Sequence, residues 1–314
     1  MSLLIPRPAR LVVLASILID VVIAVDELPA RGGDTLGRPV ARAPGGGINA
    51  ASAAARLGLP TVYAAGHGTG SDGDLVRTTL AVEGIGLARP ATPGQDTGYC
   101  VTLVTPDAER TFVTVAGAEA STTPHDLQAV RYQAGDAVYV SGYDLAYPGT
   151  GPALAEHLGR LPAGLLLVLD PGPLVDQIPV ERWNRVLARV EVLSLNAREH
   201  ALLTTDPSRQ LGASTVVVRR DGPAGAQLLA PGHPPLVAPG YPVLARDTTG
   251  AGDVHVGAML AGLAEGRDWA GALDLANRAA AVSVTRTGGA TGPTLAELAG
   301  AELIQPSTAP GPVG

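Results

Sequence analysis

The 314-residue sequence predicts a doubly wound α/β fold, with a mostly parallel central sheet and helices on both faces. Short β-branched runs alternate along the chain with helical stretches, which is the order that parallel strands with crossover helices require. The run at 165–169 is apolar at every position, as in a strand buried on both faces. With 46% hydrophobic residues, the chain can bury a large core as one domain with an elaboration or as two domains.

The expected elements follow one another as short segments. Strands are expected at residues 11–15, 61–65, 137–141, 165–170, 192–195 and 215–219, and helices at 50–57, 75–82, 152–160 and 254–264. Two places break the alternation. Residues 17–25 continue from the first strand without a helix, and 98–105 with 111–115 are expected to form a hairpin that turns at 106–110. We expect both to be antiparallel strands outside the main sheet.

Composition excludes several classes of protein. The net charge of -7 argues against a nucleic-acid surface, which needs a basic stripe. All 22 basic residues are Arg, and the absence of Lys excludes a Walker A loop, a Schiff base and a protein-kinase site. Cys100 is the only cysteine, which excludes an intrachain disulfide and a multi-cysteine metal site and favours a cytoplasmic enzyme. The apolar run at 11–25 is interrupted by Asp20, so neither a signal peptide nor a membrane span is expected.

The most informative segment is Asp247-Thr248-Thr249-Gly250-Ala251-Gly252-Asp253. It places a carboxylate where a turn of small residues enters a predicted helix. A phosphate can approach the N–H groups of such a turn closely, and the helix dipole favours its negative charge. Asp253 would lie beside that charge as a proton acceptor. An Asp at a helix N-terminus also has a purely structural explanation, so the segment alone leaves both interpretations open.

Two segments together carry a family resemblance. The first, extended through Gly257-Ala258-Met259-Leu260, resembles the C-terminal signature of the ribokinase-like (PfkB) carbohydrate kinases. The second, Pro44-Gly45-Gly46-Gly47-Ile48-Asn49 with the small-residue helix at 50–57, resembles the N-terminal sugar-binding turn of that family. Two motifs in this order are more specific than either alone. The resemblance runs from about Leu11 to Leu298.

The resemblance implies a domain organisation and a reaction. Residues 1–304 would form one ribokinase-like α/β domain, insertions at about 17–43 and 96–118 would form a small β-sheet lid over the sugar, and 305–314 would be a flexible tail. The lid would also be the surface of a homodimer. The enzyme would use ATP and Mg²⁺ to phosphorylate a primary hydroxyl of a sugar or sugar-like compound, without nucleic-acid or membrane partners.

The resemblance also assigns roles to residues. Asp253 would be the catalytic base, with Gly250, Ala251 and Gly252 as the anion hole. The sugar would be bound by Asp20, Gly45, Gly46, Gly47 and Asn49. Two alternatives stay open, because Asp20 has the position of a turn residue between core and lid strands and Asn49 that of a helix N-cap.

The same resemblance assigns the nucleotide and metal residues. ATP would be contacted by Asn196, Arg220, Gly222, Gly225 and Asn277, and Glu199 would organise Mg²⁺ through water. A monovalent cation such as K⁺ would lie near Asp247, Thr249, Ser283, Arg286 and Gly288. The structural alternatives are a capping box at Asn196 and Glu199 and a plain hairpin turn at 220–225.

Three features depart from the family pattern or invite other interpretations. Val254 and His255 follow the catalytic Asp where many members have Ser or Thr and an aromatic residue, and we expect His255 to be a packing substitute. The glycine-rich segment 66–73 lacks the dinucleotide spacing and favours a structural turn. Arg110 in the hairpin either reaches a substrate group or, as we expect, lies at a solvated tip.

The leading hypothesis is therefore a sugar kinase. A nucleoside kinase and a sugar-phosphate kinase of the same fold stay open, although 3% aromatic residues leave little material for stacking on a purine substrate. A ligand-binding pseudokinase is the alternative from another class, and its support is the substitution at Val254 and His255. An NAD-dependent oxidoreductase is a remoter one.

Overall fold

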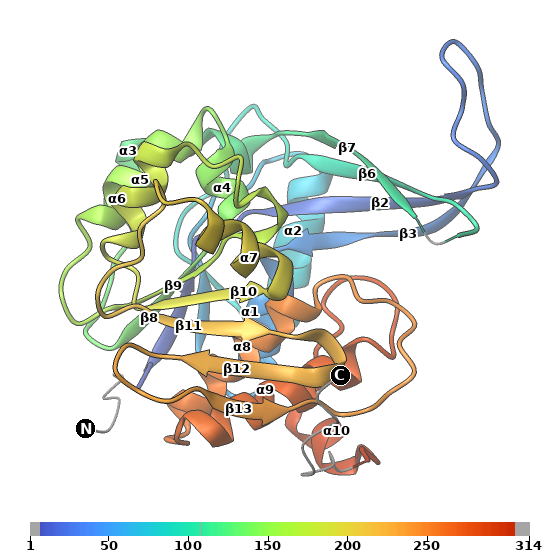
Figure 1. Ribbon diagram of the computed structural model, residues 1–314. Coiled ribbons are helices and arrows are strands. Elements are labelled where there is room, and N and C mark those ends of the chain that lie inside the picture. The colour runs from blue at the N-terminus through green and yellow to red at the C-terminus, as the bar shows by residue number, and fades with distance from the viewer. Residues whose placement is uncertain (1–6, 108, 305–314) are drawn as a thin grey trace.

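The computed structural model describes residues 7–107 and 109–304 and is built around a nine-stranded sheet (Figure 1). The strand order is β13-β12-β11-β10-β9-β8-β1-β4-β5. The strands from β11 to β5 in this order all pair in parallel. At one edge, β12 pairs antiparallel with both β11 and β13. The strands are β1 (Arg10–Val13), β4 (Thr61–Tyr63), β5 (Gly86–Leu87), β8 (Asp136–Ser141), β9 (Leu166–Asp170), β10 (Val192–Asn196), β11 (Val216–Arg220), β12 (Gly225–Leu229) and β13 (Leu236–Pro239).

Helices cover both faces of this sheet, so the predicted doubly wound fold is confirmed. Side chains of β1 alternate between the faces: Leu11 and Val13 join one buried apolar cluster, and Val12 joins the other. The first cluster holds α1 (Ile48–Arg56), α2 (Ser71–Val82), α8 (Ala251–Ala264), α9 (Trp269–Ser283) and α10 (Leu295–Gly300). The second holds α3 (Pro124–Ala129), α4 (Gly142–Ala146), α5 (Thr150–Gly159), α6 (Val180–Leu187) and α7 (Ala197–Thr205).

Helices α1 and α8 pack closely because their contact is made of small residues. The positions of α1 from Ile48 to Ala54 are all buried. Gly257 of α8 lies against the carbonyl of Ala50 and the methyl group of Ala53, and a Cβ at this glycine would collide with both. The two helices that carry the two sequence signatures are therefore held at a short, fixed separation.

A separate four-stranded sheet projects from the main body (Figure 1). Its order is β3-β2-β6-β7, with β2 (Ile17–Val25), β3 (Gly37–Gly46), β6 (Tyr99–Val104) and β7 (Arg110–Val115). The expectation of antiparallel strands is correct for the β2/β3 and β6/β7 hairpins but wrong for the whole sheet, because β2 pairs with β6 in parallel. The two hairpins come from distant parts of the chain, and their adjoining strands, β2 and β6, run in the same direction.

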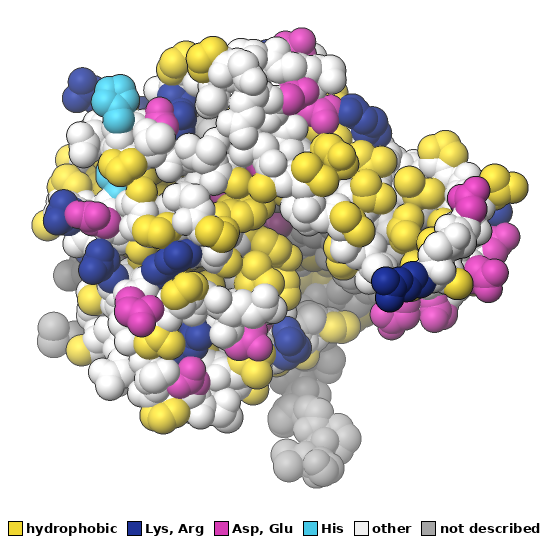
Figure 2. All heavy atoms as spheres, turned by 90° about the horizontal axis from the view of Figure 1, so that it is seen from above, with side chains coloured by type: hydrophobic (Ala, Val, Ile, Leu, Met, Phe, Trp, Pro, Cys, Tyr) yellow, Lys and Arg dark blue, Asp and Glu magenta, His cyan; other side chains and the backbone are white. Residues whose placement is uncertain are grey.

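Hydrophobic side chains gather on this small sheet in the view from above (Figure 2). The exposed ones on its strands and directly before β3 are Leu36, Val40, Tyr99, Phe112, Val113 and Val115. The expected tail at 305–314 lies outside the described residues. Across the described ranges, none of the helices combines the length and apolar character needed to cross a lipid bilayer.

Candidate active site

The two sequence signatures meet where α1 and α8 begin. The Nδ2 of Asn49 lies 3.4 Å from Oδ2 of Asp253, although the two residues are 204 positions apart. The Oδ1 of Asn49 accepts a hydrogen bond of 2.7 Å from the backbone N–H of Ala290. The expectation of an N-cap at Asn49 is wrong, because α1 is capped by Gly47 and Asn49 lies inside its first turn. Its amide is therefore free to link the two signatures.

Asp253 is half-buried at the N-terminus of α8 and has a second partner that the sequence did not reveal. The hydroxyl of Tyr139, on β8, donates a hydrogen bond of 2.7 Å to Oδ1 of Asp253. Burial, with the charge of Asp170, raises the pKa of the Asp253 carboxyl to about 6, against the opposing effects of Tyr139, Arg220 and Asn49. Such a carboxylate is ionised at neutral pH and accepts a proton more readily than an ordinary Asp.

The turn before α8 is shaped by two glycines. Gly250 has φ of 71°, in the left-handed region, and a Cβ there would collide with the side chain of Asn49. A Cβ on Gly252 would collide with the guanidinium of Arg220. The first turn of a helix leaves N–H groups without intrahelical partners, and here they lie beside that guanidinium. This end of α8 is therefore suited to hold an anion.

Charged side chains converge where β9, β10 and β11 end. Arg220 is partly buried and forms an ion pair with Asp170 at 2.8 Å, and its Nη2 lies 3.7 Å from Glu199. Sequence reasoning missed Asp170, whose only signal was its position at the end of an apolar strand. Burial, reinforced by Asp170, raises the pKa of the Glu199 carboxyl. The carboxyl ends of parallel strands place these groups on one edge of the sheet, which is the usual location of ligand sites in such folds.

The capping-box interpretation at Asn196 and Glu199 is confirmed. The backbone N–H of Glu199 donates to Oδ1 of Asn196 at 2.9 Å, and that of Asn196 donates to Oε2 of Glu199 at 2.8 Å. A role of these side chains toward a nucleotide or a metal stays a prediction.

Asp20 lies on β2 with its carboxylate directly against Gly45 of the neighbouring β3. Gly45 pairs with Leu18 in the register, and a Cβ on Gly45 would collide with the Asp20 carboxylate, so glycine is needed beside it. Burial raises the pKa of Asp20 to about 6, and the nearby charge of Arg110 opposes the rise. Gly46 has φ of 64° and lets β3 turn back toward the core beside the carbonyl of Ser16.

Arg110 is exposed beside the turn of the β6/β7 hairpin, as expected, but its guanidinium also forms an ion pair that the sequence did not reveal. Its Nη2 donates to Oδ1 of Asp247 at 2.7 Å, and its Nη1 contacts the hydroxyl of Thr249. The same carboxylate accepts the backbone N–H of Thr249 at 2.9 Å and, through Oδ2, that of Gly288 at 3.3 Å. Arg110 thus connects the small sheet directly to the loop that precedes α8.

A cavity of about 400 Å³ lies beside the N-terminus of α8. The residues that line it come from the strand ends and from α8 and α9: Asn196, Arg220, Gly222, Pro223, Gly225, Gly240, Tyr241, Val243, Ala245, Thr248, Ala251, Gly252, His255, Asn277, Ala280, Ala281 and Val284. Gly222 and Gly225 have φ of 58° and 98°, which requires glycine at these turns. The size and mainly apolar lining suit a small-molecule ligand.

His255 and Asn277 are buried residues that line this cavity. The Nδ2 of Asn277 donates to the carbonyls of Ala238 at 2.9 Å and Pro239 at 3.1 Å, so its Oδ1 faces Nε2 of His255 at 3.2 Å. Burial lowers the pKa of His255 to about 3, which keeps the ring neutral. The expected packing role of His255 agrees with this buried, neutral state.

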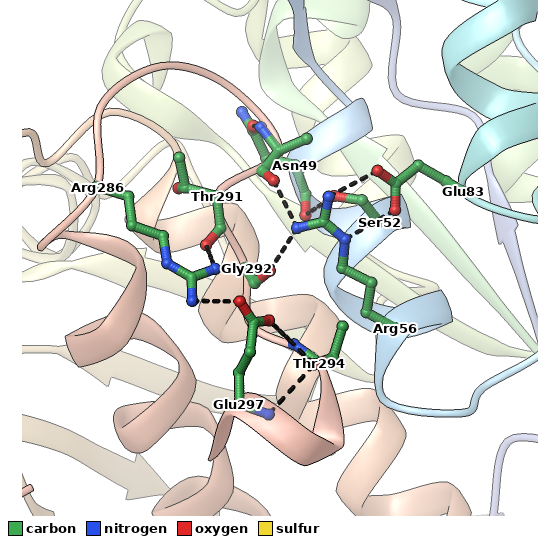
Figure 3. A network of polar contacts seen from close by, with 10 residues as sticks. Asn49, Ser52, Arg56, Glu83, Arg286, Thr291, Gly292, Thr294 and Glu297 are labelled. Atoms are coloured by element: carbon green, nitrogen blue, oxygen red, sulfur yellow. Dashed lines mark hydrogen bonds and ion pairs between the residues drawn. The ribbon is translucent and has the colours of Figure 1, made fainter. Parts of the chain in front are cut away.

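The residues expected around a monovalent cation lie in the loop before α8, at the last residue of α9 and in the loop that follows α9. The backbone N–H of Arg246 donates to the carbonyl of Val284 at 2.7 Å, which holds the loop before α8 beside the end of α9. The guanidinium of Arg286 faces the carbonyl of Thr291 at 3.2 Å and Glu297 at 2.6 Å, so this side chain braces the loop (Figure 3). Ser283 is buried and donates to the carbonyl of Ala280.

Arg56 braces the same loop from α1. Its Nη1 donates to the carbonyls of Ala290, at 2.7 Å, and Gly292, and its Nε and Nη2 pair with Glu83 at 2.8 and 2.6 Å (Figure 3). The loop that holds the amide of Asn49 is therefore fixed from two sides.

The glycine-rich segment at 66–73 is a structural turn, as expected. The carboxylate of Asp96 accepts the backbone N–H groups of Gly73 at 2.8 Å and Asp72 at 3.2 Å, at the start of α2. Cβ atoms on Gly68 and Gly70 would collide with Asp96 and its neighbour. These glycines make room for the protein's own chain.

Comparisons with known proteins agree with this geometry. The model of the pfkB family carbohydrate kinases matches residues 8–295. An uncharacterized sugar kinase of Escherichia coli K12, YegV, is 33% identical over 299 residues, covering 91% of this chain and 92% of that protein. Among solved structures, Arabidopsis thaliana ribokinase complexed with ribose and ATP matches with a TM-score of 0.74 at 23% identity, covering 93% of this chain and 98% of that one. A nucleoside kinase of Methanocaldococcus jannaschii matches with a TM-score of 0.79 at 15% identity, covering 94% and 98%.

Proposed function

Since this chain belongs to the pfkB family of carbohydrate kinases, we propose that it transfers the γ-phosphoryl group of ATP to a hydroxyl of a sugar or sugar-like substrate. One observation carries the proposal. The N-terminal signature, through Asn49, contacts the C-terminal signature, through Asp253, beside the glycine turn of α8. An alcohol held by the N-terminal signature would then lie next to a base and an anion-binding helix end.

Asp253 would take the proton of the attacking hydroxyl. The hydroxyl oxygen forms a bond to the γ-phosphorus, the bond from that phosphorus to the β–γ bridging oxygen breaks, and ADP leaves with the electron pair. The N–H groups of Gly250, Ala251 and Gly252 would hold the charge of the transferred group. The raised pKa of Asp253 supports its role, because a base with a pKa near 6 is both ionised and basic enough at neutral pH.

The sugar would lie between the small sheet and the first turn of α1. Asp20 would accept hydrogen bonds from its hydroxyl groups, and Gly45, Gly46 and Gly47 would let the ring approach the backbone. Asn49 would contact a hydroxyl while it holds Asp253. The small sheet would act as a lid that excludes water, with Arg110 linking it to the loop before α8.

ATP would occupy the cavity beside α8. Asn196, Arg220, Gly222, Gly225 and Asn277 line it, and the Arabidopsis ribokinase of the same fold was solved in complex with ribose and ATP. Magnesium would neutralise the phosphates when bound. Glu199 and Asp170 are the acidic side chains nearest Arg220, and because the capping box engages Glu199, we propose that it acts through water.

Two further features belong to the proposal. A monovalent cation such as K⁺ would bind backbone carbonyls near Asp247, Thr249, Ser283, Arg286 and Gly288, in the loops that the contacts of Asp247 hold together. A homodimer would cover the exposed hydrophobic side chains of the small sheet. Added K⁺ in the kinase assay and sedimentation of the purified protein test these two points.

A coupled assay of ADP release against pentoses, hexoses, nucleosides and sugar phosphates, with and without K⁺, tests the function. We expect turnover of a neutral sugar by the wild type and at least an about hundredfold lower kcat for Asp253→Asn with nucleotide still bound. Turnover of nucleosides or sugar phosphates instead would assign the substrate to those alternatives. No turnover of any compound, with ATP bound, would favour the pseudokinase.

A further inference from the structure

The small sheet is joined to the main body at four chain crossings, and three of them are hydrogen-bonded directly to a buried carboxyl group. The crossings lie before β2, after β3, before β6 and after β7. Glu119 of the short helix η1 (Ala118–Ser121) and Asp144 of α4 are each 1% exposed, and both lie in the main body. Neither is assigned a part in binding ATP or sugar. Their contacts nevertheless fall on the connections of the lid.

Glu119 holds both ends of the β6/β7 hairpin. Its Oε2 accepts the backbone N–H of Gly98 at 2.8 Å, and its Oε1 accepts that of Gly117 at 2.8 Å. Gly98 directly precedes β6, and Gly117 follows β7. A Cβ on Gly98 would collide with the Glu119 carboxylate, so the glycine is required for this contact.

Asp144 holds the crossing between β1 and β2. Both of its carboxylate oxygens lie near the backbone N of Ser16, at 3.1 and 3.2 Å. The carbonyl of Ser16 accepts the N–H of Gly47 at 2.8 Å, which ties the crossing after β3 to the same point. Burial raises the pKa of Asp144 to about 7, and the charge of Glu119 contributes to the rise, so the two carboxylates are electrostatically coupled.

These contacts lead to the proposed sugar-binding Asp20. The carbonyl of Gly98 accepts the backbone N–H of Ile19 at 3.0 Å. Ile19 precedes Asp20 on β2, so Glu119 is connected to Asp20 through a chain of two hydrogen bonds. The hydrogen bonds that the carboxyl groups of Glu119 and Asp144 accept from backbone N–H groups therefore restrain the lid at its base.

We propose that Glu119 and Asp144 are positioning residues of the kinase, which together form the hinge that sets Asp20 and the lid over Asp253. The proposal rests on the function proposed above only for its kinetic consequence. The position of the hinge itself is a property of the fold. Both carboxyl groups accept backbone N–H groups of the lid connections and would act through them.

The test compares Glu119→Gln and Asp144→Ala with matched controls, Asp136→Asn and Asp136→Ala. Ala is used at position 144 because the oxygen of an Asn could still accept the N–H of Ser16. Asp136 is also 1% exposed and accepts a backbone N–H, that of Gln133 at 2.8 Å, but its other partner is Arg10 of the central sheet. In Glu119→Gln one oxygen is replaced by an NH₂ group, which faces an N–H donor. Hydrogen–deuterium exchange of the full-length proteins then reports local opening without any need for activity.

For both hinge variants we expect exchange of the small-sheet amides to quicken at least about tenfold, with β9 unchanged. We also expect a sugar KM at least about tenfold higher with the ATP KM within about twofold. Neither Asp136→Asn nor Asp136→Ala should change the exchange of the small-sheet amides or the sugar KM selectively. Equal protection of the small sheet in wild type and hinge variants, or loss of protection spread equally over β9, would overturn the proposal. If Glu119→Gln does not fold, Glu119→Asp keeps the charge and shortens the reach, and the same selective exchange is required of it.

The two proposals fail in different ways. A wild-type protein that turns over no compound would contradict the proposed function, while the exchange pattern would still decide the hinge. An active enzyme whose hinge variants keep the wild-type sugar KM and wild-type exchange would contradict the hinge alone.

Discussion

Replacing Asp253 with Asn should stabilise the protein at neutral pH but not at pH 4. Burial and the charge of Asp170 raise the pKa of Asp253 from 3.8 to about 6. In the unfolded chain this carboxyl titrates near its ordinary value, so between about pH 4 and 6 the folded protein binds more protons there than the unfolded protein. The free energy of unfolding therefore falls as pH rises through this window. Above it, the full penalty of burying the charge is present.

The magnitude follows from the shift. About two pKa units at about 1.4 kcal/mol each give about 3 kcal/mol as an upper value. Asp253 is half-buried, so solvent screening reduces this term, and we expect about 2 kcal/mol. The Asn side chain carries no charge at any pH, and its oxygen can still accept the hydrogen bond from Tyr139. Its NH₂ group then faces the Nδ2 of Asn49, and the loss of that long 3.4 Å contact is smaller than the charge penalty. With an unfolding entropy of about 2.1 cal/mol/K per residue over 314 residues, 2 kcal/mol corresponds to a Tm higher by about 3 °C.

Scanning calorimetry of wild type and variant at pH 7.5 and pH 4 measures this difference. The variant should melt about 3 °C higher than wild type at pH 7.5 and at nearly the same temperature at pH 4. A variant that melts at or below wild type at pH 7.5, or a Tm difference that is the same at both pH values, would refute the reasoning. The buried charge would then not be the source of the penalty.

Three further outcomes are expected. Because the pKa values of Asp20 and Asp253 are both about 6, a plot of log(kcat/KM) for the sugar against pH should fall below pH 6 with a limiting slope near two. Asp20→Asn should reduce this slope to one, and a slope of one for the wild type would contradict the prediction. Arg110→Met removes a half-exposed ion pair and should raise the sugar KM about threefold to tenfold, whereas Arg38→Met, which breaks an exposed pair on the same sheet, should leave it unchanged. Gly45→Ala should raise the sugar KM at least about tenfold, because its methyl group displaces the carboxylate of Asp20, and an unchanged KM would show that this carboxylate does not bind the sugar.

The sequence was sufficient to predict the features that depend on residues close to one another in the chain. The alternation of apolar runs and helical stretches identified most of the central sheet, since buried parallel strands have few alternative patterns. The turn at 250–252 was recognisable because its glycines are required by a positive φ and by close contacts. The capping box at Asn196 was visible from spacing alone.

The missed features depend on contacts between distant segments. Tyr139 lies in a strand that reads as ordinary core, and only the fold brings its hydroxyl to Asp253. Arg110 had the pattern of a hairpin tip, and its partner Asp247 is 137 positions away. Asn49 was expected to cap α1, but the helix begins two residues earlier and frees its amide. The parallel pairing of β2 with β6 likewise joins two hairpins that look independent in sequence.

The contact of Gly257 with the backbone of Ala50 has a consequence for how this enzyme can change. In the proposed reaction, two helix backbones in the core would set the distance between Asp253 and the acceptor hydroxyl, whereas the residues around the sugar would come mainly from the projecting strands. Mutations in those strands can redirect selectivity and leave the chemical step intact. A larger residue at 257 would instead move Asp253 relative to every substrate alike, and would slow the reaction without altering which sugar is preferred.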